Sequence, residues 1–155
     1  MNESFKKHVE ALNPSYIRLL AMEAVLITKL PKEMPTSGVY VLYEDGQPVY
    51  VGRSNRMKSR LQVHCRPSSN HNTAPFAFRL AREQTGREKS SYTSKGSRSE
   101  LEQDSTFKTA FNNSKQRVRA MKVRYVEERD PIRQYLLEIY VAVSTEAKYN
   151  DFDTH

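Results

Sequence analysis

Residues 38–52 read GVYVLYEDGQPVYVG, and this stretch decides the local fold because a turn-forming segment separates two apolar and aromatic runs. The runs are Gly38 to Tyr43 and Val49 to Gly52, and their β-branched and aromatic residues favour strands. Asp45 and Gly46 lie between the runs, and this pair favours a tight turn. The stretch therefore predicts a β-hairpin.

The length of the turn determines which residues of the hairpin face each other. A two-residue turn would place Tyr40 opposite Val51, whereas a three-residue turn would place Tyr40 opposite Tyr50. The sequence permits both. We favour the three-residue turn, because it gives two phenols a shared location and because Pro48, which lacks an N–H, fits beside a bulge or on an edge.

Helical patterns surround the hairpin on both sides. Asn13 followed by Pro14 is typical of a helix start, and the spacing of apolar residues predicts a helix over residues 14–29. Further helices are expected over residues 55–64 and near residues 75–84.

The C-terminal part of the chain contains three more patterns. Ser99 and Glu102 form a capping-box pattern ahead of apolar residues at helical spacing. Residues 121–126 alternate as a third strand. Asp130 followed by Pro131 starts a last helix. The apolar face that we expect for this helix consists of Ile132, Leu136, Ile139 and Val143.

This order of elements predicts an α+β fold, in which helices pack around a small mixed or antiparallel three-stranded sheet. The 155 residues suit a single domain. We expect residues 1–36 to form an N-terminal helical extension. Residues 67–120 are expected to be an insertion between the helix near residue 60 and the third strand.

The charge of the chain points to a polyanionic partner. The formal net charge is +7 and the pI is about 9.5, which favours nucleic acid or an anionic membrane without choosing between them. An apolar run of about 20 residues, long enough to cross a bilayer, is missing, and so is an apolar signal core. We therefore expect a cytoplasmic protein without a membrane partner. The single cysteine, Cys65, excludes an internal disulfide framework and a cysteine-based zinc site.

Basic residues cluster in two places. Residues 53–66 contain no acid, and the polar stretch over residues 85–98 is expected to be a mobile loop. The cations that we expect to contact nucleic acid in these two segments are Arg53, Arg56, Lys58, Arg66, Arg87, Lys89, Lys95 and Arg98.

Glu138 is the only charged residue in the apolar run over residues 134–143. A buried carboxylate is unfavourable unless it is paired, protonated or bound to a metal. Taken alone, Glu138 would be an edge residue or part of a structural ion pair. Arg60 and His64, four residues apart on a predicted helix, would by themselves form a solvated basic face.

Taken together, these residues follow a known order. Gly38-Val39-Tyr40 and, ten residues after its tyrosine, Tyr50-Val51-Gly52 resemble the two signature tripeptides of GIY-YIG nucleases, with Val in place of Ile. Arg60 follows the second tyrosine by ten residues and His64 comes four residues later, as in that family. Glu138 and Asn150 resemble its distant Glu and Asn. The resemblance implies an active site made of Tyr40, Tyr50, Arg60, His64, Glu138 and Asn150.

The resemblance also implies roles for these residues. Glu138 would hold one divalent metal, Mg²⁺ or Mn²⁺, and Tyr40 would accept the proton of the attacking water, directly or as a relay. Arg60 would brace the scissile phosphate. Tyr50 and His64 would position water or phosphate, and Asn150 would orient groups around the metal.

The expected function is a metal-dependent endonuclease that hydrolyses DNA phosphodiester bonds, of the restriction type or associated with a mobile element. DNA is the expected partner, and a homodimer is a candidate assembly. Alternatives are a catalytically inactive nucleic-acid-binding module, a nuclease acting on RNA, and a structural interaction protein. Target choice is expected from the insertion, the N-terminal helices, a dimer mate or another protein.

Overall fold

The computed structural model describes residues 1–87 and 98–152, and the chain divides into two compact units. The first, here called the sheet unit, consists of Met1–Arg60 and Met121–Asp151. The second, here called the helical unit, consists of the described residues within Leu61–Ala120 together with Phe152. The helical unit contains the segment predicted as an insertion, residues 67–120.

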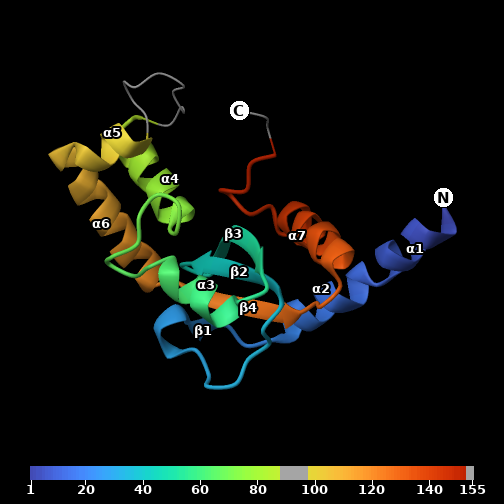
Figure 1. Ribbon diagram of the computed structural model, residues 1–155. Coiled ribbons are helices and arrows are strands. Elements are labelled where there is room, and N and C mark those ends of the chain that lie inside the picture. Colours follow the sequence, from blue (N-terminus) through green and yellow to red (C-terminus); the bar gives the residue numbers. More distant parts are fainter. Residues whose placement is uncertain (88–97, 153–155) are drawn as a thin grey trace. The chain divides into compact units, whose positions relative to one another are not determined.

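Figure 1 labels the elements, which follow one another along the chain as α1 (Glu3–Glu10), α2 (Leu12–Ala21), β1 (Val25–Leu26), the 3-10 helix η1 (Ile27–Lys29), β2 (Gly38–Glu44), β3 (Gln47–Ser54), α3 (Met57–Val63), α4 (Pro75–Gln84), α5 (Arg98–Gln103), α6 (Ser105–Arg119), β4 (Lys122–Glu127) and α7 (Pro131–Thr145). The fold is α+β, as predicted. Among the described residues, every helix is too short or too polar to span a bilayer.

The sheet has four antiparallel strands in the order β1-β4-β2-β3, and not the three that we expected. The additional strand lies within the helix predicted over residues 14–29, which in fact ends at Ala21. Val25 pairs with Val123 of β4, and the Arg124 Nε donates to the Met22 carbonyl over 2.6 Å. Pairing with β1 satisfies backbone groups on the edge of β4 that would stay unpaired if the helix continued, so tertiary contacts override the helical pattern.

The β2–β3 hairpin has a register that neither predicted turn produces. Asp45 and Gly46 both have positive φ, 51° and 77°, and form a two-residue turn of the kind that suits a hairpin. A bulge at Leu42/Tyr43 then shifts the ladder by one residue, so Tyr40 faces Gly52. The favoured three-residue turn, with Tyr40 opposite Tyr50, is wrong, because the turn residues and the bulge set the register together.

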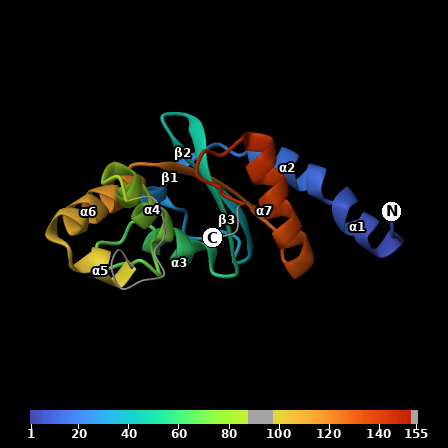
Figure 2. The ribbon, with the colours of Figure 1, turned by 90° about the horizontal axis from the view of Figure 1, so that it is seen from above.

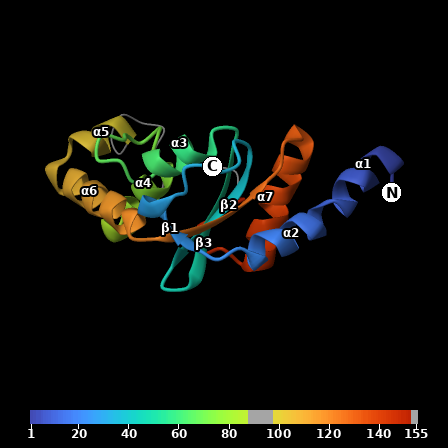
Figure 3. The same cartoon turned by 90° about the horizontal axis from the view of Figure 1, so that it is seen from below.

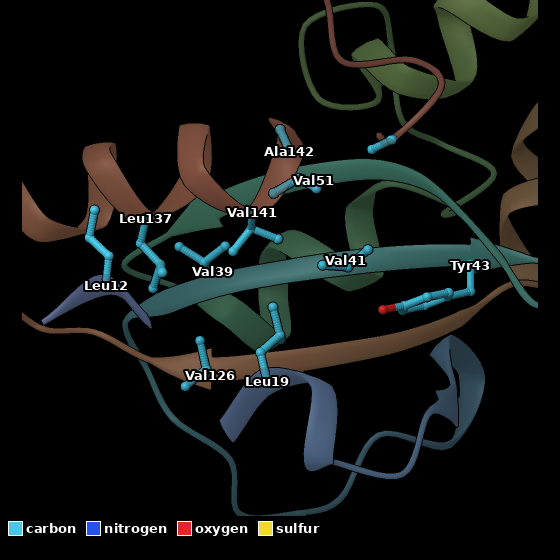
Figure 4. Close-up of a cluster of buried hydrophobic side chains, with 11 residues drawn as sticks. Leu12, Leu19, Val39, Val41, Tyr43, Val51, Val126, Leu137, Val141 and Ala142 are labelled. Atoms are coloured by element: carbon cyan, nitrogen blue, oxygen red, sulfur yellow. The ribbon is translucent and has the colours of Figure 1, made fainter. Parts of the chain in front are cut away.

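One face of the sheet forms the core of the sheet unit. Figure 4 shows Val39, Val41 and Tyr43 of β2 pointing into a cluster with side chains from α2 and α7. Leu19 comes from α2, and Leu137 comes from α7. These two helices therefore cover this face, which leaves Tyr40 on the opposite face because side chains alternate along a strand.

Helix α7 starts where predicted, since the Asp130 side chain caps it by accepting from the Arg133 backbone N–H at 3.0 Å. Its predicted apolar face is wrong at three of the four positions, and only Leu136 packs against the core. Ile132, Ile139 and Val143 are 53%, 49% and 61% exposed, whereas the buried residues are Gln134, Leu137, Val141 and Ala142.

A polar residue can occupy the buried face of α7 because its hydrogen bonds are satisfied. The Gln134 side-chain amide donates to Asn55 Oδ1 at 2.7 Å and to the Glu128 carbonyl at 2.8 Å. A buried amide with such partners no longer carries the penalty of an unpaired polar group. The helix therefore rotates away from the orientation that hydropathy alone predicts.

The helical unit packs around aromatic rings. Helix α4 matches its predicted range, and the Phe78 ring lies 5.0 Å from that of Phe107 and 5.4 Å from that of Phe111, both on α6. Figures 2 and 3 show α4 lying along one side of α6. Helix α3 spans Met57–Val63, close to the predicted residues 55–64. Residues 88–97 of the loop expected to be mobile lie outside the described residues.

The predicted capping box at Ser99 and Glu102 is wrong. Asp104 caps α6 instead, since its carboxylate accepts from the Phe107 backbone N–H at 3.0 Å. Glu102 accepts from the backbone N–H of His71 at 2.7 Å, with the His71 Nδ1 2.9 Å away. The pattern failed because a long-range partner competes with a local cap for the same carboxylate.

Candidate active site

The two tyrosines of the tripeptides share the face of the sheet opposite the α2–α7 core. Leu42, two residues after Tyr40, pairs directly with Tyr50, so the two phenols are diagonal neighbours across β2 and β3. Their ring centroids lie 6.5 Å apart at an interplanar angle of 42°. The expected shared location of the two phenols is present, although the register that produces it differs from the predicted one.

Gly52 allows the Tyr40 ring to lie across the neighbouring strand. A Cβ atom on residue 52 would clash with the Tyr40 hydroxyl and its ring carbon Cζ. At Gly38, a Cβ would clash with the backbone carbonyl of Val126 on β4. The glycine of each tripeptide is therefore required by close approach, a role that sequence reasoning missed even though glycine inside a strand pattern is a signal for it.

The Tyr40 phenol is fully buried and keeps its proton at neutral pH. Burial raises the pKa of Tyr40 well above its ordinary value of 10.0, and the neighbouring Tyr50 raises it further. Arg60 hydrogen-bonds to Tyr40 and acts in the opposite direction. The Glu138 carboxylate is close enough for its charge to raise the pKa of Tyr40 as well. Residues of β3, α3 and α7 therefore all affect the pKa of Tyr40.

Glu138 is half-buried on α7 and forms an ion pair with the edge strand. Its Oε2 lies 3.2 Å from the Arg53 Nε, and the Arg53 guanidinium carbon lies 3.5 Å from the centroid of the Tyr135 ring. Burial raises the pKa of Glu138, and Arg53 offsets part of this effect. Sequence reasoning missed Tyr135, although its position three residues before Glu138 places both on one side of a helix.

Asn150 binds the backbone of the edge strand. Its Oδ1 accepts from the Val51 N–H at 2.7 Å, and its Nδ2 donates to the Val51 carbonyl at 2.9 Å. The adjacent Tyr149 backbone N–H donates to the Val49 carbonyl at 2.9 Å. The segment after α7 therefore occupies the open side of β3 next to Gly52, which protects an otherwise unpaired sheet edge.

The remaining predicted site residue, His64, lies in the helical unit, and its side chain is fully buried. The five other residues all lie in the sheet unit. They are Tyr40, Tyr50, Arg60, Glu138 and Asn150.

The cations predicted to contact nucleic acid have different surroundings. Arg53 pairs with Glu138, Lys58 donates to the Pro31 carbonyl at 3.1 Å, and Arg87 pairs with Asp104 at 3.2 Å. Four of these cations are exposed, namely Arg56, Arg66, Arg87 and Arg98. Lys89 and Lys95 lie outside the described residues.

Glu138 is the carboxylate that could hold a metal ion at this site. Across residues 1–87 and 98–152, no group of three His, Cys, Asp or Glu side chains is placed to hold a metal. Glu138 is a half-buried carboxylate paired with the Arg53 guanidinium, and Mg²⁺ commonly binds through one or two carboxylates while keeping several waters. The donor chemistry of Glu138 therefore fits a Mg²⁺ or Mn²⁺ ion.

The chain matches no protein-family model, no curated protein and no solved structure.

Proposed function

We propose that the chain is a metal-dependent endonuclease of the GIY-YIG type that hydrolyses DNA phosphodiester bonds. One observation carries the proposal: the buried Tyr40 phenol hydrogen-bonds to Arg60 and lies near enough to Glu138 to be affected by its charge, although Arg60 and Glu138 are 78 residues apart in the sequence. A buried phenol, a guanidinium and a half-buried carboxylate are the groups that this chemistry needs for water, phosphate and metal.

Arg60 is assigned to the scissile phosphate. Its planar guanidinium can donate two parallel hydrogen bonds to phosphate oxygens, which fixes the position of the phosphorus relative to Tyr40. Its hydrogen bond with Tyr40 orients the guanidinium before substrate arrives. Arg60 would then stabilise the charge that develops on the phosphate oxygens in the transition state.

Tyr40 is assigned to the attacking water. Because burial favours its neutral form, the phenol first acts as a hydrogen-bonding group that orients the water. Proton acceptance by Tyr40 requires additional positive charge in the occupied site. A divalent ion held by Glu138 would supply such charge and would acidify its own bound water. Tyr50, as the ring beside Tyr40, limits the positions open to that water.

A catalytically inactive nucleic-acid-binding module is the second candidate function. The observation that favours it is the Arg53–Glu138 ion pair, which already neutralises the proposed metal ligand. The two candidates differ in one measurable property, because only the nuclease requires Glu138 to bind a divalent ion.

Incubation of the purified protein with supercoiled and linear DNA, with Mg²⁺ or with chelator, tests the proposal. We expect cleavage only with Mg²⁺, and a loss of about 10²-fold or more in the Glu138→Gln variant. Glu33→Gln is the matched control, since Glu33 is exposed, and it should cleave like the parent. Cleavage that persists in Glu138→Gln would contradict the assigned metal ligand. Preferential cleavage of matched RNA would contradict the assigned substrate.

A further inference from the structure

Helix α6 presents a polar outward face in the helical unit. Its buried side consists of Phe107, Phe111, Ser114, Lys115 and Val118, which face the interior of the unit. The exposed side carries two cations, three carboxamides and three hydroxyls: Lys108, Arg119, Asn112, Asn113, Gln116, Ser105, Thr106 and Thr109. Two of the three carboxamides are Asn, a weak helix former, so helix propensity does not account for them.

The outward face of α6 lacks acidic residues, which distinguishes it from an ordinary solvated face. Residues 105–120 contain no Asp or Glu. A typical exposed helix mixes both signs at a spacing of four residues. Helix α1 of the same chain has this pattern, with Lys6 and Glu10 3.8 Å apart. The composition of α6 therefore favours a polyanionic partner.

The segment that contains α6 also carries most of the net charge. Residues 61–120 hold eleven Lys and Arg against five Asp and Glu, a net charge of +6 in a chain whose net charge is +7. A polyanion is therefore attracted mainly to this segment. Charge complementarity points to nucleic acid. The carboxamides can also hydrogen-bond to base edges, which phosphate binding alone does not require.

We infer that α6 is a recognition helix that enters the major groove of duplex DNA, an inference that rests on the proposed nuclease function. Asn and Gln side chains can pair bidentately with adenine, and Arg or Lys with guanine. Asn112 and Gln116 lie one helical turn apart on the outward face, so they reach neighbouring base pairs. The 15 residues of α6 span about 22 Å, and a helix of ordinary diameter fits the groove.

The surroundings of α6 hold its axis while leaving its outward side chains available. Asp104 caps its first turn, and the buried Lys115 Nζ donates inward to the carbonyls of Pro67 at 2.6 Å and Ser69 at 2.9 Å. Within the described part of the chain, Asn112 and Gln116 make no side-chain hydrogen bond and no ion pair. A rigid helix with unengaged carboxamides is suited to base readout.

Selection from a pool of random duplex DNA tests this inference. The full-length protein is incubated with the pool in chelator, which prevents metal-dependent cleavage, and the bound fraction is sequenced. We expect the parent to enrich a short motif. The Asn112→Ala/Gln116→Ala variant should lose discrimination by about ten-fold or more at each contacted base pair. Both positions are exposed, so circular dichroism melting should show an intact fold.

The matched control removes two other exposed carboxamides of the same unit. Gln62→Ala/Asn72→Ala should enrich the parent's motif unchanged. A second variant, Lys108→Gln/Arg119→Gln, should lower the slope of log K against log salt by about 0.9 for each phosphate that a cation no longer neutralises. Loss of the motif in the α6 variant, with retention in the control, supports the inference.

Three outcomes would overturn the inference that α6 is a recognition helix. The parent could enrich no motif, the α6 variant could retain the parent's motif, or matched duplex RNA could bind more tightly than DNA. The last outcome counts because the narrow major groove of A-form RNA excludes a helix. These results are separable from the proposed activity. Mg²⁺-dependent cleavage without a motif refutes only the recognition helix, and a motif without cleavage refutes only the nuclease.

Discussion

Arg53 of β3 and Glu138 of α7 form an ion pair with Nε and Oε2 3.2 Å apart, and both side chains are about 30% exposed. The Tyr135 ring lies against the guanidinium and limits its movement. A cation from the protein therefore already accompanies the carboxylate that we propose as a metal ligand. A divalent ion must compete with Arg53 or displace it.

Removal of this competing cation should strengthen metal binding. We expect Arg53→Gln to bind Mn²⁺ about five-fold more tightly than the parent, the change that corresponds to roughly 1 kcal/mol for a partly exposed ion pair. Titration followed by electron paramagnetic resonance measures this affinity without any catalytic step. Arg56→Gln is the control, because Arg56 is exposed and its loss changes the net charge equally. Equal affinities in the three proteins would show that Arg53 does not compete with the ion.

The two phenols should differ in their effect on turnover. Tyr40→Phe removes the buried hydroxyl that interacts with Arg60, so we expect a loss of about 10²-fold or more in single-turnover cleavage. Tyr50→Phe should reduce turnover less, since Tyr50 is only half-buried and flanks Tyr40. Because burial raises the pKa of Tyr40, its phenolate is not populated near neutral pH in the free protein. Turnover of Tyr40→Phe close to that of the parent would remove this phenol from the reaction.

The close approach of Tyr40 to Gly52 predicts a destabilising substitution. Gly52→Ala places a Cβ against the Tyr40 hydroxyl, and overpacking of this kind costs about 1–3 kcal/mol. Urea denaturation should give this value in the parent background. In a Tyr40→Leu background the same change should cost much less, since the clashing atoms are gone. An equal cost in both backgrounds would show that the clash is not with Tyr40.

Glu138 should make the stability of the protein depend on pH. Burial raises its pKa in the folded protein above the usual 4.5, so below pH 4.5 the carboxyl is neutral in both states and stability is unaffected. As the pH rises through the raised pKa, the unfolded chain releases the proton more readily and stability is lost.

Glu138→Gln cannot ionise and should therefore escape this loss. Its urea midpoint should exceed that of the parent by an amount that grows as the pH rises from 4.5 through the raised pKa and is constant above it. Glu33→Gln, at an exposed position, should show no such trend. A difference between Glu138→Gln and the parent that is constant with pH would mean that Glu138 is not destabilised by burial.

Local chemistry was sufficient to predict several elements from the sequence. Asp130 and Pro131 predicted the start of α7, and the residues around Asp45 and Gly46 predicted a hairpin. Helix α4 was found at its predicted residues. All these inferences depend on capping, turn preference or spacing within a few residues, which neighbours in the chain determine by themselves.

Tertiary structure decided the features that depend on partners distant in the sequence. The β4 edge converted Val25 and Leu26 from a predicted helix into a strand, and the hydrogen bonds of Gln134 rotated α7 away from its apolar face. The bulge that turns Tyr40 toward Gly52 and the ion pair of Arg53 with Glu138 also lie beyond local patterns. In each case the stabilising free energy comes from pairing backbone, polar or charged groups with partners elsewhere in the fold. A single stretch of sequence does not specify where those partners will lie.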